Sequence, residues 1–282
     1  MNRRERRASA SAARRGQPPA NAPASVGGPA FVQRRQPQSQ PPLPSAAELL
    51  QRAVSSDARG VVARVLAEGP SADRLHELVD RAADVGAAYM ERSPTNPSLL
   101  ACKKGCSTCC SRPVVATAPS VLRLATWLRA RLRPEQLGEL LRRVAAIDDV
   151  THGKTMTPKE RPPTPCALLV DGACSAYEVR PFVCRAWNAV DAEDCKRALS
   201  KDGLEMRFDL YQRTTYASVE QGVKSALSDA GLDGADLELM AALRVALERE
   251  DASRAWLAGE PVFAGCEAKL PEATRRRLPV AW

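Results

Sequence analysis

The sequence predicts a mostly α-helical protein with an irregular cysteine-rich centre, preceded by a disordered basic tail. Apolar residues recur at helical spacing through most of the chain, and no stretch shows the sustained apolar/polar alternation of a half-buried strand. Eight of the nine cysteines fall within residues 102–195. The excess positive charge is concentrated in the first 44 residues. These observations divide the chain into a tail, residues 1–44, and a helical domain, residues 45–282.

The tail combines eight arginines and eight prolines with one acidic residue, Glu5. It therefore carries nearly all of the net charge of +8, because the remaining residues are almost balanced. Such a composition cannot bury enough apolar surface to offset the entropy lost on ordering, so we expect disorder. A basic arm of this kind could bind nucleic acid or another anionic partner. Its only aromatic residue is Phe31, which leaves little for base stacking, so we favour a solvated tail.

Two helices are expected at the start of the domain. Ser45 and Glu48 have the form of a capping box and predict a helix that runs to about Leu66. Gly69-Pro70 interrupts the chain, and Ser71 can cap a second helix. The apolar face of that second helix is formed by Leu75, Leu78, Val79, Ala82, Val85 and Tyr89.

Helical periodicity continues beyond a predicted turn at residues 93–98. Pro119-Ser120 and Pro134 each stand where a helix begins, since proline is favoured in the first helical turn. Four prolines and a glycine predict a loop over residues 151–165. Further helices are expected at about 208–230, 235–249 and 251–258.

The chain shows no signal for membrane insertion or export. It has no run of 18 apolar residues, which argues against a membrane-spanning helix. No apolar segment follows the basic N-terminus, which argues against a secretory signal. We therefore expect a cytoplasmic protein in a reducing compartment, where clustered cysteines more often bind metal than form disulfides.

The first cysteine group reads Cys102-Lys-Lys-Gly-Cys106-Ser-Thr-Cys109-Cys110. Thiolates two or three residues apart can converge on one ion, and Gly105 supplies the permissive backbone for the turn. Such spacing recurs in zinc and iron–sulfur sites. The adjacent Cys109 and Cys110 fit one tetrahedral ion poorly, because neighbouring side chains usually point apart. A larger cluster, two metals, or one ligand with a bystander would explain the pair.

The second group consists of Cys166, Cys174, Cys184 and Cys195. Its gaps are too long for local chelation, so the fold must bring these residues to the first group. Metal binding would then join two distant segments and stabilise the domain. Cysteine ligands favour zinc, Cu(I) or iron–sulfur centres. A disulfide framework and a set of inert buried cysteines are the weaker alternatives.

Three further residues are expected to lie outside the metal centre. Cys266 is isolated in the C-terminal segment and is interpreted as structural. His76 has no cysteine nearby in the sequence, and His152 lies in the proline-rich loop. We interpret both histidines as surface or capping residues.

At these cysteines the sequence resembles the YkgJ-like cysteine-cluster family of zinc- or iron-chelating proteins, which carry a CxxCxxCC motif. The resemblance covers residues 102–195, about one third of the chain. The gap between Cys102 and Cys106 is one residue longer than the motif, which makes Cys102 the least secure ligand. The matching residues are Cys102, Cys106, Cys109, Cys110, Cys166, Cys174, Tyr177, Arg180, Pro181, Cys184, Arg185 and Cys195.

The resemblance implies a metal centre held by the eight cysteines at 102, 106, 109, 110, 166, 174, 184 and 195. It leaves open whether the cofactor is zinc or an iron–sulfur cluster such as [4Fe–4S]. The related flagellin lysine methylases suggest an alternative, an iron–sulfur enzyme that performs redox chemistry or protein-lysine methyl transfer. The sequence shows no glycine-rich SAM-binding pattern, general base or phosphate loop. We therefore expect a structural or chelating role and leave enzymatic activity undecided.

Basic residues around the cysteines could offset the negative charge of metal-bound thiolates and donate N–H bonds to sulfur. For Arg180 and Arg185, the alternative is an ordinary salt bridge to an acidic residue nearby. Those acids are Glu178, Asp191 and Asp194. Tyr177 and Trp187 are expected to pack, and Pro181 to shape the turn that presents Cys184. The basic set comprises Lys103, Lys104, Arg112, Arg180 and Arg185.

Overall fold

The computed structural model describes residues 43–69, 71–157, 160–161, 163–200 and 207–271. This part of the chain is mostly helical, which confirms the predicted fold class. Its helices and strands all belong to one unit that begins at Pro44. The prediction of a disordered basic tail falls on residues that, apart from Leu43 and Pro44, lie outside the described ranges.

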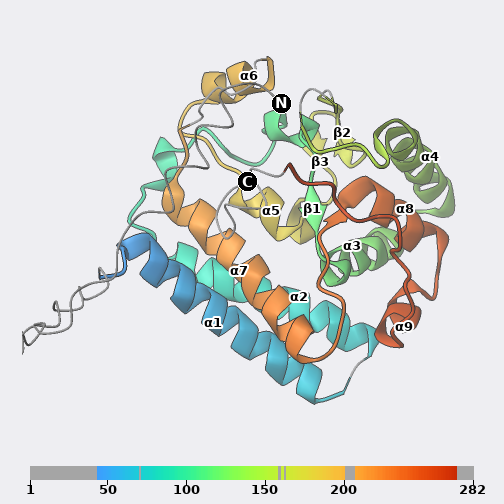
Figure 1. The fold of residues 1–282 in the computed structure, drawn as a ribbon. Helices are drawn as coiled ribbons and strands as arrows, with labels where there is room; N and C mark the ends of the chain where they lie inside the picture. The colour runs from blue at the N-terminus through green and yellow to red at the C-terminus, as the bar shows by residue number, and fades with distance from the viewer. Residues whose placement is uncertain (1–42, 70, 158–159, 162, 201–206, 272–282) are drawn as a thin grey trace, which may run out of the picture. The chain divides into compact units, whose positions relative to one another are not determined.

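Three long helices lie side by side: α1 (Ala46–Ala67), α2 (Ala72–Met90) and α7 (Leu210–Asp229) (Figure 1). The capping box of α1 is formed as predicted. Its Ser45 Oγ accepts from the Glu48 N–H at 3.3 Å, and Glu48 Oε2 accepts from the Ser45 N–H at 2.7 Å. Ser71 caps α2 by accepting from the Arg74 N–H at 3.2 Å.

Gly222 allows α7 to approach α1 closely. A Cβ atom at position 222 would lie 2.5 Å from the Ser55 carbonyl oxygen and 2.7 Å from the Ala58 Cβ. Because only glycine lacks this atom, the two helix backbones can come into direct contact here.

A second set of helices comprises α3 (Ala118–Arg131), α4 (Pro134–Thr151), α8 (Leu239–Glu248) and α9 (Ala252–Leu257). Helix α8 packs against both α3 and α4. Pro134 occupies the start of α4, as predicted. The helix expected at 235–249 begins only at Leu239, because residues 237–238 form a strand.

That strand is β4 (Leu237–Glu238), which pairs antiparallel with β1 (Val115–Ala116). The second two-stranded sheet is a hairpin of β2 (Leu169–Val170) and β3 (Ala173–Cys174). Asp171 and Gly172 join β2 to β3 with φ values of 49° and 74°. An Asp-Gly pair suits such a two-residue turn because both positions need positive φ.

The cysteine-rich segment is more ordered than the sequence predicted. It contains α5 (Phe182–Ala186) and α6 (Ala192–Ser200), and three short 3₁₀ helices lie in or beside it. Asp191 accepts from the Glu193 N–H at 2.9 Å and so supports the start of α6. The 3₁₀ helices are η1 (Pro97–Leu99), η2 (Thr108–Ser111) and η3 (Tyr177–Val179).

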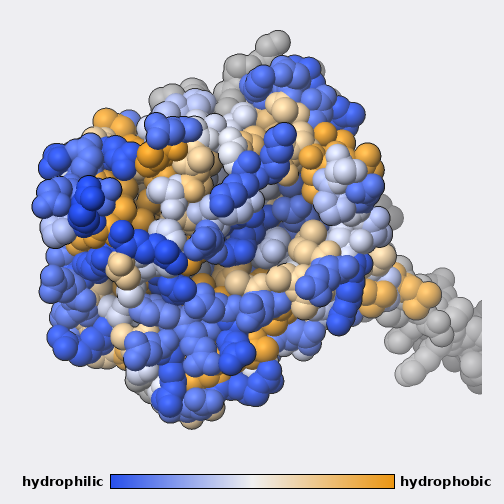
Figure 2. Space-filling model, turned by 180° about the vertical axis from the view of Figure 1, so that it is seen from behind, coloured by the Kyte–Doolittle hydropathy of each residue, from blue (hydrophilic) through white to orange (hydrophobic). Residues whose placement is uncertain are grey.

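The hydrophobic core runs between the two sets of helices and rests chiefly on leucine, valine and alanine. Its largest fully buried side chains include Phe182, Leu75, Leu78, Leu122, Leu124, Leu128, Leu140, Leu227, Leu237, Leu239 and Leu243. On the face shown in Figure 2, hydrophilic residues predominate and apolar residues form separate patches. Among the described residues, no helix is both long and apolar enough to span a membrane.

Candidate metal centre

The first cysteine group occupies a turn and the 3₁₀ helix η2. Cys106 donates its N–H to the Lys103 carbonyl oxygen at 3.0 Å, which closes the turn. Gly105 has a φ of 94°, so the expected need for a permissive backbone at this position is confirmed. Cys109 and Cys110 follow in η2, where the Cys109 thiol forms a hydrogen bond with Cys110.

The second cysteine segment runs directly beside the first. The Cys166 N–H donates to the Cys110 carbonyl oxygen at 2.8 Å, and the Thr164 N–H donates to the Ser111 carbonyl oxygen at 3.2 Å. Cys174 is on β3, opposite Leu169 in the hairpin. Backbone hydrogen bonds therefore join the chain around Cys166 to the first cysteine group, and the convergence of all eight cysteines stays a prediction.

Short helices carry the last two cysteines of the series. Cys184 lies in α5, with Pro181 directly before the helix at its N-cap position, and Cys195 lies in α6. The loop between α5 and α6 is held to the first group at Ala189. Its N–H donates to Cys102 Sγ at 3.1 Å, and its carbonyl oxygen accepts from the Ala101 N–H at 3.0 Å.

Cys184 is influenced electrostatically by three other cysteines. Burial is the largest cause that raises the pKa of its thiol well above the usual value. The negative charges of Cys166, Cys109 and Cys174 raise this pKa further.

A different set of cysteines influences the pKa of Cys195. Burial raises the pKa of Cys195 to about 11, and the charges of Cys102, Cys106 and Cys109 add to the shift. Cys109 thus contributes to the pKa shifts of both Cys184 and Cys195. Its own pKa is raised chiefly by the hydrogen bond with Cys110 and then by burial.

These thiols do not form a finished coordination sphere. All nine cysteines are free. Within the described ranges, no group of three or more His, Cys, Asp or Glu side chains is arranged so that it could hold a metal ion. Binding would require the thiols to lose their protons.

Backbone N–H groups point at several of these sulfur atoms. Burial raises the pKa of Cys102, Cys166 and Cys174, whereas hydrogen bonds from backbone groups oppose the rise. The donors are Ala189 for Cys102, Leu168 for Cys166 and Ala176 for Cys174. Hydrogen bonds of this kind favour the ionised form of a thiol.

Among the described cations, Arg180 shifts the pKa of the largest number of cysteines, four of them. Its positive charge lowers the pKa of Cys102, Cys109, Cys174 and Cys184, opposing the effect of burial. The guanidinium lies over the Tyr177 ring, 3.7 Å from its centroid. Its buried Nε has no hydrogen-bond partner among the described residues. Arg180 is therefore positioned to act on the thiols.

Arg185 points elsewhere. Its Nη2 donates to the Glu178 carbonyl oxygen at 2.6 Å and its Nε to the Arg180 carbonyl oxygen at 3.2 Å. The acids considered as salt-bridge partners for the two arginines have other partners. Asp191 and Asp194 pair with Arg207 at 3.1 Å and 2.8 Å, and Asp194 also pairs with Arg197. Glu178 pairs with Arg131 at 3.6 Å.

Two aromatic residues help to hold the surrounding cations. Trp187 packs edge-on against Phe208, with 5.9 Å between ring centroids. The Arg112 guanidinium lies 5.2 Å from the Trp187 ring, and its Nη2 donates to the Ala198 carbonyl oxygen of α6 at 2.9 Å. Lys104 lies 6.0 Å from the Tyr177 ring. The expected packing role of Tyr177 and Trp187 agrees with these contacts.

Cys266 and the two histidines lie in the core, on α2 and at the end of α4. Cys266 is buried in the hydrophobic core, 4% exposed. His152 is the C-cap of α4, and its Nδ1 lies 3.1 Å from Asp148 Oδ1. His76 is half-buried on α2, where burial lowers its pKa.

Sequence reasoning missed Arg143 and Ala189. Arg143 lies on α4, and its charge opposes the effect of burial on the pKa of Cys166. Neither residue belongs to a local motif, so no pattern in the sequence could have identified them. The β2–β3 hairpin was also missed, although Asp171-Gly172 is a recognisable turn signal.

No family model matches the chain, and no curated protein or solved structure matches it either. The resemblance to the YkgJ-like family at residues 102–195 therefore stays a prediction based on the cysteine pattern.

Proposed function

We propose that this protein binds metal through the thiolates of Cys102, Cys106, Cys109, Cys110, Cys166, Cys174, Cys184 and Cys195, in a structural or chelating role. The observation that carries the proposal is the backbone hydrogen bond from the Cys166 N–H to the Cys110 carbonyl oxygen at 2.8 Å, which joins the two cysteine groups. A metal ion would favour ionisation of these cysteines, because its positive charge stabilises thiolates that burial otherwise disfavours.

The donor set suits a thiophilic metal. Backbone N–H groups and the Arg180 charge already favour the ionised form of several sulfurs. Outer donors of this kind orient and tune metal ligands. We take zinc and an iron–sulfur cluster as the two candidate cofactors, since both are held by cysteine thiolates. Membership of the YkgJ-like family and a reducing, cytoplasmic location are part of the same proposal.

We further propose that the eight cysteines form two four-membered sets. Cys195 experiences the charges of Cys102, Cys106 and Cys109, and Cys184 those of Cys166, Cys174 and Cys109. The adjacent Cys109 and Cys110 would each complete one set, which explains a pair that one tetrahedral ion accommodates poorly. Four thiolates leave no open position on zinc, so such sites would not be hydrolytic.

The test is to purify the full chain anaerobically, without added metal, and to measure metal content and the visible spectrum on one sample. Zinc at about two per chain, without colour, would support two tetrahedral sites. A brown protein with iron and labile sulfide would support an iron–sulfur centre, and redox and methyl-transfer assays would follow. A chain that binds neither metal when zinc or iron with sulfide is then supplied would overturn the proposal.

A further inference from the structure

A buried asparagine holds the loop between α5 and α6. Asn188 is only 2% exposed. Its Nδ2 donates to the Ala186 carbonyl oxygen at 3.2 Å and to the Asp209 carbonyl oxygen at 3.1 Å, and its Oδ1 accepts from the Asp209 N–H at 2.6 Å. Both N–H groups of the side-chain amide are therefore used. The opposite orientation of the amide would place Nδ2 against the Asp209 N–H, so these partners fix the orientation.

These hydrogen bonds tie the end of α5 to the start of α7. Ala186 is the last residue of α5, and Asp209 is the N-cap of α7. The Val190 N–H adds a backbone bond to the Arg207 carbonyl oxygen at 3.1 Å. Residues 188–190 are therefore attached to the segment that leads into α7.

The other side of the same loop faces the first cysteine group. The Ala189 N–H donates to Cys102 Sγ at 3.1 Å, and the Ala189 carbonyl oxygen accepts from the Ala101 N–H at 3.0 Å. The N–H of Ala189 belongs to the planar peptide group that joins it to Asn188. Holding Asn188 in place therefore restricts the direction in which this N–H points.

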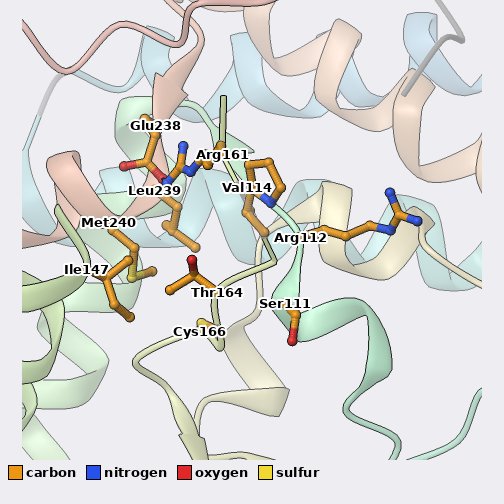
Figure 3. A pocket seen from close by; sticks show the side chains of 11 residues that line it. Ser111, Arg112, Val114, Ile147, Arg161, Thr164, Cys166, Glu238, Leu239 and Met240 are labelled. Carbon is orange, nitrogen blue, oxygen red and sulfur yellow. The ribbon is translucent and has the colours of Figure 1, made fainter. Parts of the chain in front are cut away.

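The two arginines near this part of the molecule hold other contacts. Figure 3 shows Arg161 beside Glu238, which it binds at 2.7 Å between Nη2 and Oε1, and Arg112 extended away from this pair. The Arg112 guanidinium lies 5.2 Å from the centroid of the Trp187 ring. Neither arginine donates a hydrogen bond to residues 188–190 within the described part of the chain. The attachment of the loop therefore does not come from these cations.

We propose that Asn188 is a positioning residue of the metal centre, because its amide holds the loop so that the Ala189 N–H points at Cys102 Sγ. An N–H directed at a ligand sulfur orients the ligand and tunes its electron density. Cys102 is the proposed ligand whose spacing departs from the family motif, so its place in the centre depends on tertiary contacts such as this one. The inference rests on the proposed function, since it assigns Asn188 to the same site.

Hydrogen exchange in the metal-free full chain tests the position of this N–H. Asn188→Ala removes the three side-chain hydrogen bonds and should accelerate exchange of the Ala189 amide at least about tenfold. Exchange at Val219, in the middle of α7, should change little. Asn96→Ala is the matched control. Asn96 Oδ1 accepts from the Ser98 N–H at 3.0 Å in the segment before Cys102, so its loss should leave the Ala189 amide unchanged.

Cobalt binding supplies a readout that a purely structural role would not move. Loss of the N–H donor raises the energy of the sulfur electrons, so the thiolate-to-cobalt charge-transfer band of Asn188→Ala should shift to longer wavelength. Its cobalt affinity, measured by competition with a chelator, should fall about tenfold. A residue that only stabilises the fold would lower the resistance to urea and leave the band in place. Asn96→Ala should match the wild type in both band and affinity.

Asn188→Asp keeps the shape and the acceptor for the Asp209 N–H but loses both donated bonds. It should show the same changes, and it decides the question if Asn188→Ala does not fold. Ala189 exchange as slow as in the wild type, or an unchanged cobalt band and affinity, would overturn the inference alone. A wild-type chain that binds no cobalt would overturn the proposed function and this inference together.

Discussion

The backbone N–H of Cys166 donates a hydrogen bond of 2.8 Å to the carbonyl oxygen of Cys110. This bond, with that from Thr164 to Ser111 at 3.2 Å, brings two cysteine segments that are far apart in the chain into one neighbourhood. The two segments are therefore joined by their backbones.

Replacing one cysteine from each proposed set should separate the two sites. In the zinc-bound protein, Cys184→Ser and Cys195→Ser should each lose about one zinc per chain. Each variant should retain its second zinc, because the substitution leaves the four ligands of the second set in place. Metal content by mass spectrometry measures the loss. Loss of all metal from both variants, with the helical circular dichroism unchanged, would contradict the division into two sets.

Cys266→Ser is the matched control for these substitutions. Cys266 is a buried cysteine in the core and is not one of the proposed ligands. We expect its metal content to equal that of the wild type. Equal metal content in Cys184→Ser, Cys195→Ser and Cys266→Ser would contradict the assignment of the ligands.

Arg180 should tune the metal affinity without being a ligand. Arg180→Gln removes the positive charge that favours ionisation of four thiols. We expect metal affinity, measured by competition with a chelator, to fall about tenfold. Arg180→Lys should restore part of it. Arg142→Gln is the control, because Arg142 is exposed and pairs with Glu139 on its own helix; a similar loss there would indicate a general charge effect.

Two glycines allow a direct test of the packing between α1 and α7. Gly222→Ala should lower the free energy of unfolding by about 1–3 kcal/mol, because the added methyl group would overlap the backbone of α1. Gly60→Ala in the middle of α1 should instead raise it by about 0.5–1 kcal/mol. There the nearest atom to a new Cβ is the end of the Arg64 side chain at 3.6 Å. Urea unfolding measures both, and a neutral Gly222→Ala would refute the close approach.

Glu220 on α7 should make stability depend on pH near neutrality. Burial raises the pKa of Glu220 from 4.5 to about 7, with Lys224 opposing the shift. Between those two values the folded state binds more protons than the unfolded state, so the free energy of unfolding falls as pH rises. Glu220→Gln should remove this decline and be more stable at pH 8, by about 3 kcal/mol at most.

The measurement is urea unfolding of both proteins between pH 4 and 8. Glu250→Gln, at an exposed position, should follow the wild-type curve. A Glu220→Gln curve with the same slope as the wild type would show that Glu220 does not cause the dependence.

Removing metal should loosen the cysteine segments more than the long helices. After treatment with a strong chelator, we expect faster hydrogen exchange at the Cys166 and Ala189 amides, whose acceptors are Cys110 and Cys102. Exchange within α7 should change little, because its stability rests on core packing. Uniform loss of protection would indicate that the metal stabilises the whole domain.

The sequence alone determined the helical class, most of the helices and the position of the caps. Ser45, Ser71 and Pro134 act locally, through backbone donors or dihedral angles within one turn, so their effect can be read from neighbouring residues. The same holds for Gly105, whose positive φ follows from a tight turn between closely spaced cysteines. The candidate ligands of the first cysteine group came from their spacing, and the full set of eight came from the resemblance to the YkgJ-like family.

Only the tertiary structure decided which cysteines are neighbours and what surrounds them. The strand at Leu237–Glu238 forms because β1 pairs with it, and α5 and α6 form within a segment whose local pattern is weak. Arg143 and Ala189 reach the cysteines, and Arg161 reaches Glu238, across long sequence separations. Such contacts depend on how the helices pack, and the burial that shifts the pKa of each thiol is a property of the assembled core.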